Sequence, residues 1–289
     1  MPLKNILLLY KKSAYTIYFL ERKKAFADVK RHLIRNEIER FKKAHEEHYQ
    51  TLGLIEDVLK KYRVRYEKTS RGENINYNKF DFIIAVGGDG TFLEAARNVQ
   101  KQIILGVNSS PNFSMGRLCS ANPSNFERIL KLLLQRKIKV SLVPRLRVWM
   151  SGRKESIEVT NDILICHHHP AAMSRYRLEI GGRQEEQRNS GLWISTALGS
   201  SGAIQSAGGK VINPGLKKMQ YWPRELYVML GRKYQLTGGL LSGNQKISVV
   251  SLMREGMLCV DGAHYHFPFP FGSKLKISLS PHPLRMIRI

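Results

Sequence analysis

An apolar run that stops abruptly at glycine is the feature that most constrains this chain. Residues 82–95 read FIIAVGGDGTFLEA, so five apolar residues are followed by three glycines, an aspartate and a threonine at 87–91. The run predicts a buried β-strand, and the residues after it predict a helix. Glycine in the intervening turn lets the backbone bend sharply and lets a ligand approach it closely. A strand, a tight turn and a helix in this order are typical of a parallel α/β sheet.

Strands and helices alternate through the first half of the chain. Short apolar runs predict strands at 5–10, 64–66, 82–86 and 103–107. Apolar residues at helical spacing predict two helices within 25–62, separated near Gly53, and a further helix at 93–99. This alternation indicates a parallel sheet covered by helices.

Ser124 and Glu127 have the spacing of a capping box for a further helix that ends at Leu134.

The second half of the chain is richer in predicted strands. After about residue 137, short β-rich runs follow one another without helices, separated by Gly, Asn, Asp and Pro. We therefore predict an α/β domain with a parallel, Rossmann-like sheet at 1–138 and a mainly antiparallel β domain at 139–289. The C-terminal segment either packs back on the first domain or extends freely.

Composition limits the partners and the compartment. The chain of 289 residues carries 47 Lys and Arg against 23 Asp and Glu, a formal net charge of +24. Such a charge attracts anions, whether nucleic acid, acidic lipid or phosphate-bearing metabolites, and does not choose among them. Three widely spaced cysteines without a C-x-x-C pair predict neither a disulfide framework nor a zinc cluster, so we expect a cytoplasmic protein. No apolar run approaches the ~20 residues that span a bilayer.

The glycine turn is a candidate phosphate site. It lies at the carboxyl end of a predicted parallel strand and just before a helix, where backbone N–H groups and the helix N-terminus favour an anion. It is neither a Walker A loop nor the dinucleotide fingerprint. Asp89 either caps the helix of an ordinary tight turn, or binds a sugar hydroxyl and takes its proton during transfer. The second alternative describes a kinase outside the P-loop class.

The sequence Gly87-Gly88-Asp89-Gly90-Thr91 resembles the G-G-D-G-T signature shared by NAD kinases and by the diacylglycerol and sphingosine kinases. Three further segments resemble the NAD kinases in order and spacing: Asn161-Asp162, the Ser, Thr and Gly-rich stretch from Gly191 to Asn213, and Val260-Asp261-Gly262. The loop at 106–118, GVNSSPNFSMGRL, resembles the mitochondrial-type subgroup. The resemblance covers nearly the whole chain and implies an NAD kinase-like fold.

The resemblance also implies roles for individual residues. Asp89 would be the catalytic carboxylate directed at the 2'-hydroxyl of the adenosine ribose. The residues implied to bind phosphate or nucleotide around it are Gly87, Gly88, Gly90 and Thr91. The residues implied to bind the dinucleotide are Asn161, Asp162, Ser195, Thr196, Gly199 and Ser200. No metal ligand is identified in the sequence.

One segment departs from the family pattern. Where many members read S-T-P-T-G-S-T-A-Y, this chain has Ala197, Leu198 and Ala203 in place of the proline, the second threonine and the tyrosine. The absent tyrosine removes an aromatic surface and a hydroxyl from the pocket. The sequence therefore leaves open the choice between NAD and NADH.

The activity implied by the resemblance is transfer of a phosphoryl group from ATP or polyphosphate to NAD or NADH, with Mg²⁺ or another divalent cation. Family members are usually homo-oligomers, which the resemblance implies here. A lipid kinase with the same signature and a non-catalytic nucleotide- or nucleic-acid-binding module are the alternatives. We expect neither a membrane nor a specific nucleic acid as partner, because the basic residues are spread and no nucleic-acid-binding motif is visible.

Two other groups of residues are candidates for binding. The run Cys166-His167-His168-His169 invites a metal site, but side chains alternate along a strand, so a structural role is favoured. The pairs Arg145 with Arg147 and Arg175 with Arg177 each share a predicted strand face, where they either meet phosphates or face solvent.

Overall fold

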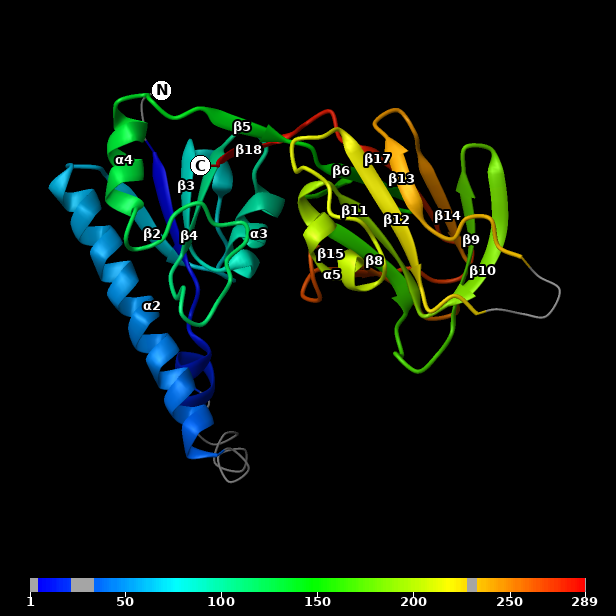
Figure 1. The fold of residues 1–289 in the computed structure, drawn as a ribbon, viewed down its shortest axis with the longest axis horizontal. Coiled ribbons are helices and arrows are strands. Elements are labelled where there is room, and N and C mark those ends of the chain that lie inside the picture. The colour runs from blue at the N-terminus through cyan, green and yellow to red at the C-terminus, as the bar shows by residue number, and fades with distance from the viewer. Residues whose placement is uncertain (1–4, 22–33, 228–232, 289) are drawn as a thin grey trace. The chain divides into compact units, whose positions relative to one another are not determined.

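The computed structural model describes residues 5–21, 34–227 and 233–288. The chain divides into two compact units. The first consists of residues 1–141 with 285–289, and the second of residues 142–284. Figure 1 traces both along the chain.

The first unit is built on one six-stranded sheet in the order β2-β1-β3-β4-β18-β5. The pairings of β1 with β2 and β3, of β3 with β4, and of β4 with β18 are all parallel. The strands are β1 (Ile6–Tyr10), β2 (Tyr66–Ser70), β3 (Phe82–Gly87), β4 (Ile103–Asn108), β5 (Val140–Val143) and β18 (Leu284–Ile287). The predicted parallel sheet is confirmed.

Helices pack on the buried faces of this sheet. The helical segments are η1 (Thr16–Glu21), α2 (Arg35–Lys61), η2 (Tyr77–Lys79), α3 (Asp89–Asn98) and α4 (Phe126–Leu134). Apolar residues of α2 and α4 form one core with alternate residues of β1, β3 and β4. Helix α3 contacts β1, β3 and β4, and a Cβ at Gly106 of β4 would lie 2.9 Å from the Phe92 ring of α3. The glycine turn between β3 and α3 is therefore fixed by packing at both ends.

Two details of the helices differ from the sequence prediction. Helix α2 runs through Gly53 without a break, and nothing lies within 4 Å of the position a Cβ would take there. The predicted split is wrong because burial of Leu52 and Ile55 outweighs the ~1 kcal/mol that glycine costs inside a helix. Residues 25–33, where the first of the two helices was predicted to begin, lie outside the described residues.

The predicted capping box of α4 is also wrong. The helix begins at Phe126, and the residue before it, Asn125, makes no side-chain cap. The side chain of Asn122 organises the entry instead, because its Oδ1 accepts hydrogen bonds from the backbone N–H groups of Ser124 and Asn125 at 2.9 and 3.3 Å. The predicted end at Leu134 is confirmed.

Strand β5 belongs to the first sheet, although its texture grouped it with the β-rich second half of the sequence. The sheet order places it beside β18, which pairs in turn with β4. The chain therefore returns to its first sheet after completing the second unit.

The second unit is a sandwich of two six-stranded sheets, in the orders β10-β9-β14-β17-β6-β7 and β13-β12-β11-β8-β15-β16. Every strand pairing within it is antiparallel, which confirms the prediction. Its elements are β6 (Leu146–Met150), β7 (Ile157–Val159), β8 (Asp162–His167), β9 (Ser174–Ile180), β10 (Arg183–Asn189), β11 (Gly191–Thr196), η3 (Leu198–Ser201), α5 (Ala203–Ser206), β12 (Lys218–Arg224), β13 (Gly239–Ser242), β14 (Ile247–Ser251), β15 (Gly256–Val260), β16 (His266–Pro268) and β17 (Lys274–Leu279). One apolar core joins the inner faces of both sheets.

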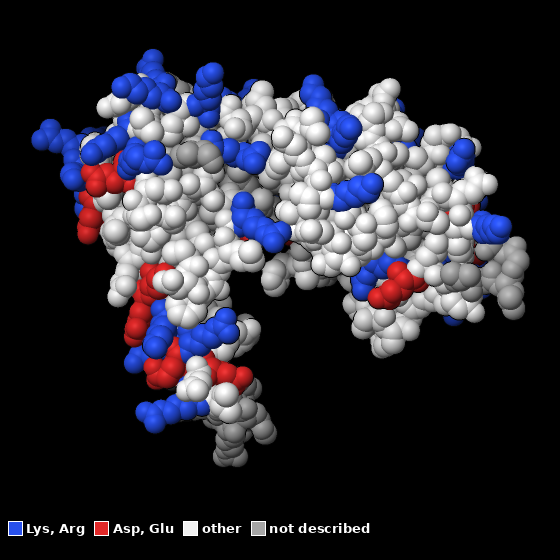
Figure 2. Space-filling model, in the orientation of Figure 1, with Lys and Arg blue, Asp and Glu red and all other residues white. Residues whose placement is uncertain are grey.

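The charged residues do not gather in one place on the visible face. Figure 2 shows Lys and Arg side chains spread over it, singly or in small groups, and mixed with Asp and Glu along α2. This face therefore offers no single track for a polyanion. In the described part of the chain, no helix is both long enough and apolar enough to cross a bilayer.

Candidate active site

The glycine turn sits at the carboxyl edge of the parallel sheet. A Cβ at Gly87 would overlap the side chain of Thr91, whose own Cβ would be 2.8 Å away. Gly88 is the residue before α3, and its carbonyl accepts hydrogen bonds from Thr91 and Phe92 at 3.0 and 3.2 Å. Gly90 is exposed. The turn therefore leaves open backbone at the N-terminus of α3, the geometry that suits an anion.

Thr91 and Asp89 differ in how they face this turn. The Thr91 side chain is buried against Gly87, so it shapes the turn from behind. Asp89 is half-buried in the first turn of α3, and its Oδ1 accepts a hydrogen bond from the Leu118 N–H at 2.8 Å. Among the described residues, no donor is recorded for Oδ2. The carboxylate is thus held by one oxygen and presents the other.

Two cations lie near the turn, at the ends of the first two strands. Lys11 directly follows β1 and Arg71 directly follows β2. A Cβ at Gly90 would lie 3.2 Å from Arg71 Nη1, and Arg71 also pairs with Glu94 of α3 at 3.0 Å. Burial lowers the pKa of Lys11, and the charge of Arg71 lowers it further. Two cations at neighbouring strand ends favour a polyanion beside them.

A buried histidine supports this edge of the sheet. His48 of α2 is fully buried, and its Nε2 donates to the Lys11 carbonyl at 2.9 Å. Its Nδ1 therefore accepts the Ser109 hydroxyl at 2.8 Å. The Ser109 N–H in turn donates to the Gly87 carbonyl at 2.9 Å. One neutral imidazole thus ties the ends of β1, β3 and β4 together.

This arrangement predicts an acid-sensitive fold. Burial, followed by the charge of Lys11, lowers the pKa of His48 from 6.5 to about 4. Because the folded-state pKa of His48 lies below the unfolded one, the neutral imidazole makes its full contribution to the unfolding free energy above pH 6.5. That contribution is lost as the pH falls towards 4, by about 3 kcal/mol in all. We expect His48→Gln to show a smaller loss of unfolding free energy between pH 7.5 and pH 4 in urea titrations. Exposed His168→Gln is the control, and equal losses in both variants would contradict the assignment.

In the second unit, the dinucleotide candidates converge on one turn before β8. The Thr196 N–H donates to the Asn161 carbonyl at 2.9 Å, and Thr196 Oγ1 donates to the Thr160 and Asn161 carbonyls at 2.8 and 3.1 Å. The Gly199 N–H donates to Thr196 Oγ1 at 3.0 Å. A Cβ on Gly199 would lie 2.6 Å from the Asn161 carbonyl carbon and still closer to its oxygen. Glycine at 199 therefore lets η3 pack directly on the turn.

The hydroxyl groups in this cluster form hydrogen bonds with backbone groups of the same cluster. Ser195, Thr196 and Ser200 are all buried. Ser195 Oγ donates to the Thr196 carbonyl, and Ser200 Oγ donates to the Ala197 carbonyl while accepting from the Ile212 N–H. These three residues hold the cluster together through hydrogen bonds to its backbone. Asn161 and Asp162 are the candidates whose side chains make no such recorded bond within the described residues.

Asp162 is a buried carboxylate without a recorded donor among the described residues. It is 5% exposed, and a Cβ at Gly202 would lie 3.5 Å from its Oδ2 and 3.6 Å from the Asn161 amide nitrogen. Burial and the charge of Asp261 raise its pKa to about 7. A carboxylate in this setting gains from a ligand that brings hydroxyl donors. Ala203, where the family pattern has tyrosine, is exposed nearby at the start of α5.

Several of the remaining candidates are engaged in other contacts. Arg145 is buried and Arg147 pairs with Glu158 at 3.0 Å, while Arg175 pairs with Glu186 at 2.8 Å. No metal-binding group of three or more His, Cys, Asp or Glu is found within the described ranges, which includes residues 166–169. Sequence reasoning missed Lys11 and Arg71, although a cation directly after a buried or paired strand end is a readable signal.

The family relationship rests on matches along most of the chain. Residues 16–138 match the model of the ATP-NAD kinase N-terminal domain, and residues 160–289 match that of the C-terminal domain. The chain belongs to the ATP-NAD kinase family. A probable NADH kinase from Oryza sativa is 32% identical over 263 residues, which cover 83% of this chain and 81% of that protein. An NAD kinase from Pyrococcus abyssi is 30% identical over 211 residues, covering 72% of this chain and 73% of that protein.

Solved structures of NAD kinases share the fold. An NAD kinase from Archaeoglobus fulgidus, solved in complex with ATP, superposes with a TM-score of 0.70 at 24% identity and covers 98% of this chain and 93% of its own. Yeast NADH kinase, complexed with NADH, superposes with a TM-score of 0.73 at 14% identity and covers 100% of this chain and 84% of its own. The fold of both units is therefore that of NAD kinases.

Proposed function

We propose that this protein transfers a phosphoryl group from a nucleoside triphosphate to the 2'-hydroxyl of the adenosine ribose of NAD or NADH, giving NADP or NADPH. Membership of the ATP-NAD kinase family and the relatives named NAD kinase and NADH kinase support it. The observation that carries it is the buried, donor-poor Asp162 carboxylate beside the Asn161 amide. A carboxylate and an amide side by side bind vicinal ribose hydroxyls well.

Asp89 would take the proton of the attacking hydroxyl. As the 2'-oxygen forms its bond to the γ-phosphorus, the bond from phosphorus to the β,γ-bridging oxygen breaks and the nucleoside diphosphate leaves with that electron pair. The hydroxyl proton passes to the carboxylate. The hydrogen bond from the Leu118 N–H to Oδ1 supports this role, because it fixes the side chain and leaves the other oxygen for the proton. The open backbone of Gly88 and Gly90 would hold the phosphates beside it.

A divalent cation such as Mg²⁺ fits this arrangement. The described residues contain no carboxylate-rich cage, and Mg²⁺ commonly uses one or two carboxylates together with substrate phosphates. Because Asp89 is assigned to the proton of the attacking hydroxyl, the phosphates of the bound triphosphate would supply most of the ligands of the cation. When bound, Mg²⁺ would neutralise charge on the phosphates and so favour in-line attack. Lys11 and Arg71 would add fixed positive charge to the same phosphates.

A cavity in the first unit supports a nucleotide donor over polyphosphate. It has a volume of about 500 Å³ and is lined by Lys11 and Ser13 after β1, by Phe41 and Ala44 of α2, and by Phe113 and Ser114 after β4, among others. Ser114 also borders the glycine turn, since a Cβ at Gly88 would lie 3.0 Å from its Oγ. A mixed aromatic and polar cavity next to a phosphate site fits a purine base. Polyphosphate would leave it unused.

Narrowing this cavity tests the identity of the donor. We expect Ala44→Leu, which adds three carbons to the lining, to raise the KM for ATP by roughly tenfold while leaving the KM for NAD unchanged. Gln50→Leu, an exposed position on the same helix, is the control. Steady-state kinetics with each donor would decide, and an unchanged KM for ATP in Ala44→Leu would remove the base from this cavity.

The proposed reaction is tested directly by product formation. Purified protein is incubated with Mg²⁺, with ATP or polyphosphate, and with NAD or NADH, and NADP and NADPH are measured by a coupled dehydrogenase assay. Product that requires both donor and dinucleotide supports the proposal and fixes the preference for each. Folded protein that yields no product with any pair would overturn it, and the same donors would then be tested with diacylglycerol and sphingosine.

We further propose that the protein works in a reducing compartment, the cytoplasm, as a homo-oligomer. The free thiols of Cys119, Cys166 and Cys259 support the first point. The oligomer follows from the family resemblance, and sedimentation velocity would measure its size.

A further inference from the structure

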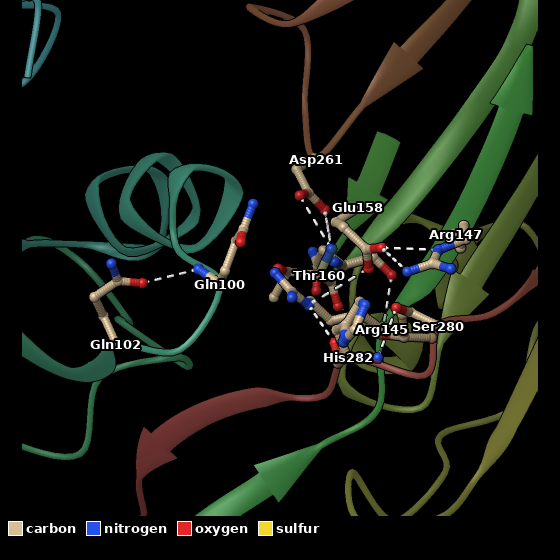
Figure 3. Close-up of polar contacts among 11 residues, drawn as sticks. Gln100, Gln102, Arg145, Arg147, Glu158, Thr160, Asp261, Ser280 and His282 are labelled. Carbon is tan, nitrogen blue, oxygen red and sulfur yellow. Dashed lines mark hydrogen bonds and ion pairs between the residues drawn. The ribbon is translucent and has the colours of Figure 1, made fainter. Parts of the chain in front are cut away.

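Asp261 holds the turn that carries Asn161 and Asp162. It follows β15 with a φ of 48°, and Gly262 after it has a φ of 106°, so the chain reverses sharply there. Both oxygens of its carboxylate accept the Thr160 N–H at 3.1 Å, and Oδ1 also accepts the Asn161 N–H at 2.6 Å. Figure 3 shows the Asp261 carboxylate directed at the backbone of Thr160.

The same turn is held from other directions. The Asp261 N–H donates to the Asp162 carbonyl at 2.9 Å, so Asp261 holds the turn through both its backbone and its side chain. On the other side, Thr196 Oγ1 donates to the carbonyls of Thr160 and Asn161. Charge-assisted hydrogen bonds to a buried carboxylate are among the stronger ones in proteins. The direction of the Asn161 and Asp162 side chains therefore depends on Asp261.

A buried arginine compensates the charge of this carboxylate. Arg145 is 1% exposed, and its Nε donates to the His282 carbonyl at 2.9 Å and lies 3.8 Å from Glu158 Oε2. Burial lowers the pKa of Arg145, while the charges of Glu158 and Asp261 raise it. Arg147 pairs with the other Glu158 oxygen at 3.0 Å, as Figure 3 shows. Arg145 and Arg147 thus balance the charges of Glu158 and Asp261.

Asp261 also acts on Asp162 through charge. Three neighbouring segments surround Asp162. Ser195 of β11 lies opposite it in register, Gly202 lies between η3 and α5, and the Asp261 carboxylate lies at the end of β15. Burial is the first cause that raises the pKa of Asp162 to about 7, and Asp261 is the second. An ionised Asp162 accepts hydrogen bonds with both oxygens and carries a charge that strengthens them, whereas the protonated form turns one oxygen into a donor. Its affinity for hydroxyls therefore grows as the pH rises through about 7.

We propose that Asp261 is a positioning residue of the acceptor site, which aligns Asn161 and Asp162 through the backbone of residues 160–162 and makes dinucleotide binding depend on pH. The proposal rests on the acceptor site of the proposed function. It assigns to Asp261 two separable effects, one of geometry and one of charge.

Two variants separate these effects. Asp261→Asn removes the charge, and its amide nitrogen cannot accept the Thr160 N–H. Asp261→Glu keeps the charge but moves the oxygens by one methylene. Binding of NAD and NADH is measured by calorimetry between pH 5.5 and pH 8.5. In the wild type, Kd should fall as the pH rises through about 7. Both variants should weaken binding at pH 8.5 by roughly tenfold, the effect of one lost hydrogen bond to a charged group.

The pH profiles distinguish positioning from a general structural defect. The pH below which dinucleotide binding weakens should be lower in Asp261→Asn, because a negative charge near Asp162 is removed. It should be unchanged in Asp261→Glu, which keeps that charge. Glu255→Gln removes one charge from an exposed position of the same unit, outside this network, and it should leave both Kd and the pH dependence unchanged. If Asp261→Asn does not fold, the wild-type profile and the Kd of Asp261→Glu decide.

The outcomes also separate this inference from the proposed reaction. Binding of NAD and NADH that is independent of pH in the wild type, or within twofold of wild type in the folded variants, would overturn the role of Asp261. A wild type that binds neither dinucleotide would overturn it as well. Dinucleotide binding with the expected pH profiles, in a protein that forms no NADP or NADPH, would overturn the proposed reaction and leave the role of Asp261 standing.

Discussion

Asp89→Asn should lower kcat for NADP formation by roughly 10²- to 10⁴-fold, the range that a positioned general base contributes. The amide oxygen can still accept the Leu118 N–H that holds the side chain, so geometry is kept and the proton acceptor is lost. We therefore expect the KM values for ATP and NAD to stay within about threefold of wild type. Steady-state kinetics at saturating substrates measure the effect.

The matched control lies at the other end of the same strand. Asp81 precedes β3 and is exposed, so Asp81→Asn makes the same chemical change away from the turn and should retain wild-type kcat. Thermal midpoints of both variants should equal that of the wild type. A kcat for Asp89→Asn within tenfold of wild type would show that another group accepts the proton.

Gly199→Ala should reduce kcat/KM for the dinucleotide by roughly 100-fold, because a displacement of about 1 Å in a positioned site has an effect of that size. The added Cβ would meet the backbone of Asn161, with its carbonyl carbon at 2.6 Å and its Cα at 2.9 Å. Backbone held by Thr196 and Asp261 cannot move aside without moving the turn. We also expect a loss of about 1–3 kcal/mol in unfolding free energy.

Gly215→Ala is the control in the same unit. The nearest atom to its Cβ would be Asn213 Oδ1 at 3.6 Å, an ordinary contact, so both kinetics and stability should match the wild type. The readouts are kcat/KM with NAD and urea unfolding. Wild-type kinetics in folded Gly199→Ala would mean that the turn at residues 160–162 does not position the acceptor.

The sequence was sufficient to predict both kinds of sheet, parallel and antiparallel, and the location of the glycine turn. Apolar runs such as β3 and β4 are unambiguous because parallel strands are buried on both faces. Strand β10, in contrast, reads RQEEQRN and was not predicted. It lies at the edge of its sheet, where backbone pairing with β9 defines the strand and no apolar alternation is needed.

The sequence named the candidate site residues, but the contacts that their side chains make could not be predicted from it. The pattern placed Ser195, Thr196 and Ser200 at the dinucleotide, yet their hydroxyls bond to backbone within the cluster. Which hydroxyls turn inward depends on tertiary packing, which no spacing reveals. Asp261 was noted only as part of a resembling motif, because its partners lie about a hundred residues earlier in the chain. Membership of the mitochondrial-type subgroup stays a prediction.

The position of β18 has a consequence for how the protein is made. This strand lies between β4 and β5 in the first sheet, although the whole second unit separates it from them in sequence. During synthesis, β4 therefore emerges from the ribosome long before β18 exists, and the part of its edge at Ile103 and Ile104 stays unpaired while the sandwich is translated. The second unit can fold independently, whereas the sheet that carries the glycine turn is completed last. Ribosome-bound chains that stop before residue 284 should accordingly be more sensitive to proteolysis in the first unit than in the second.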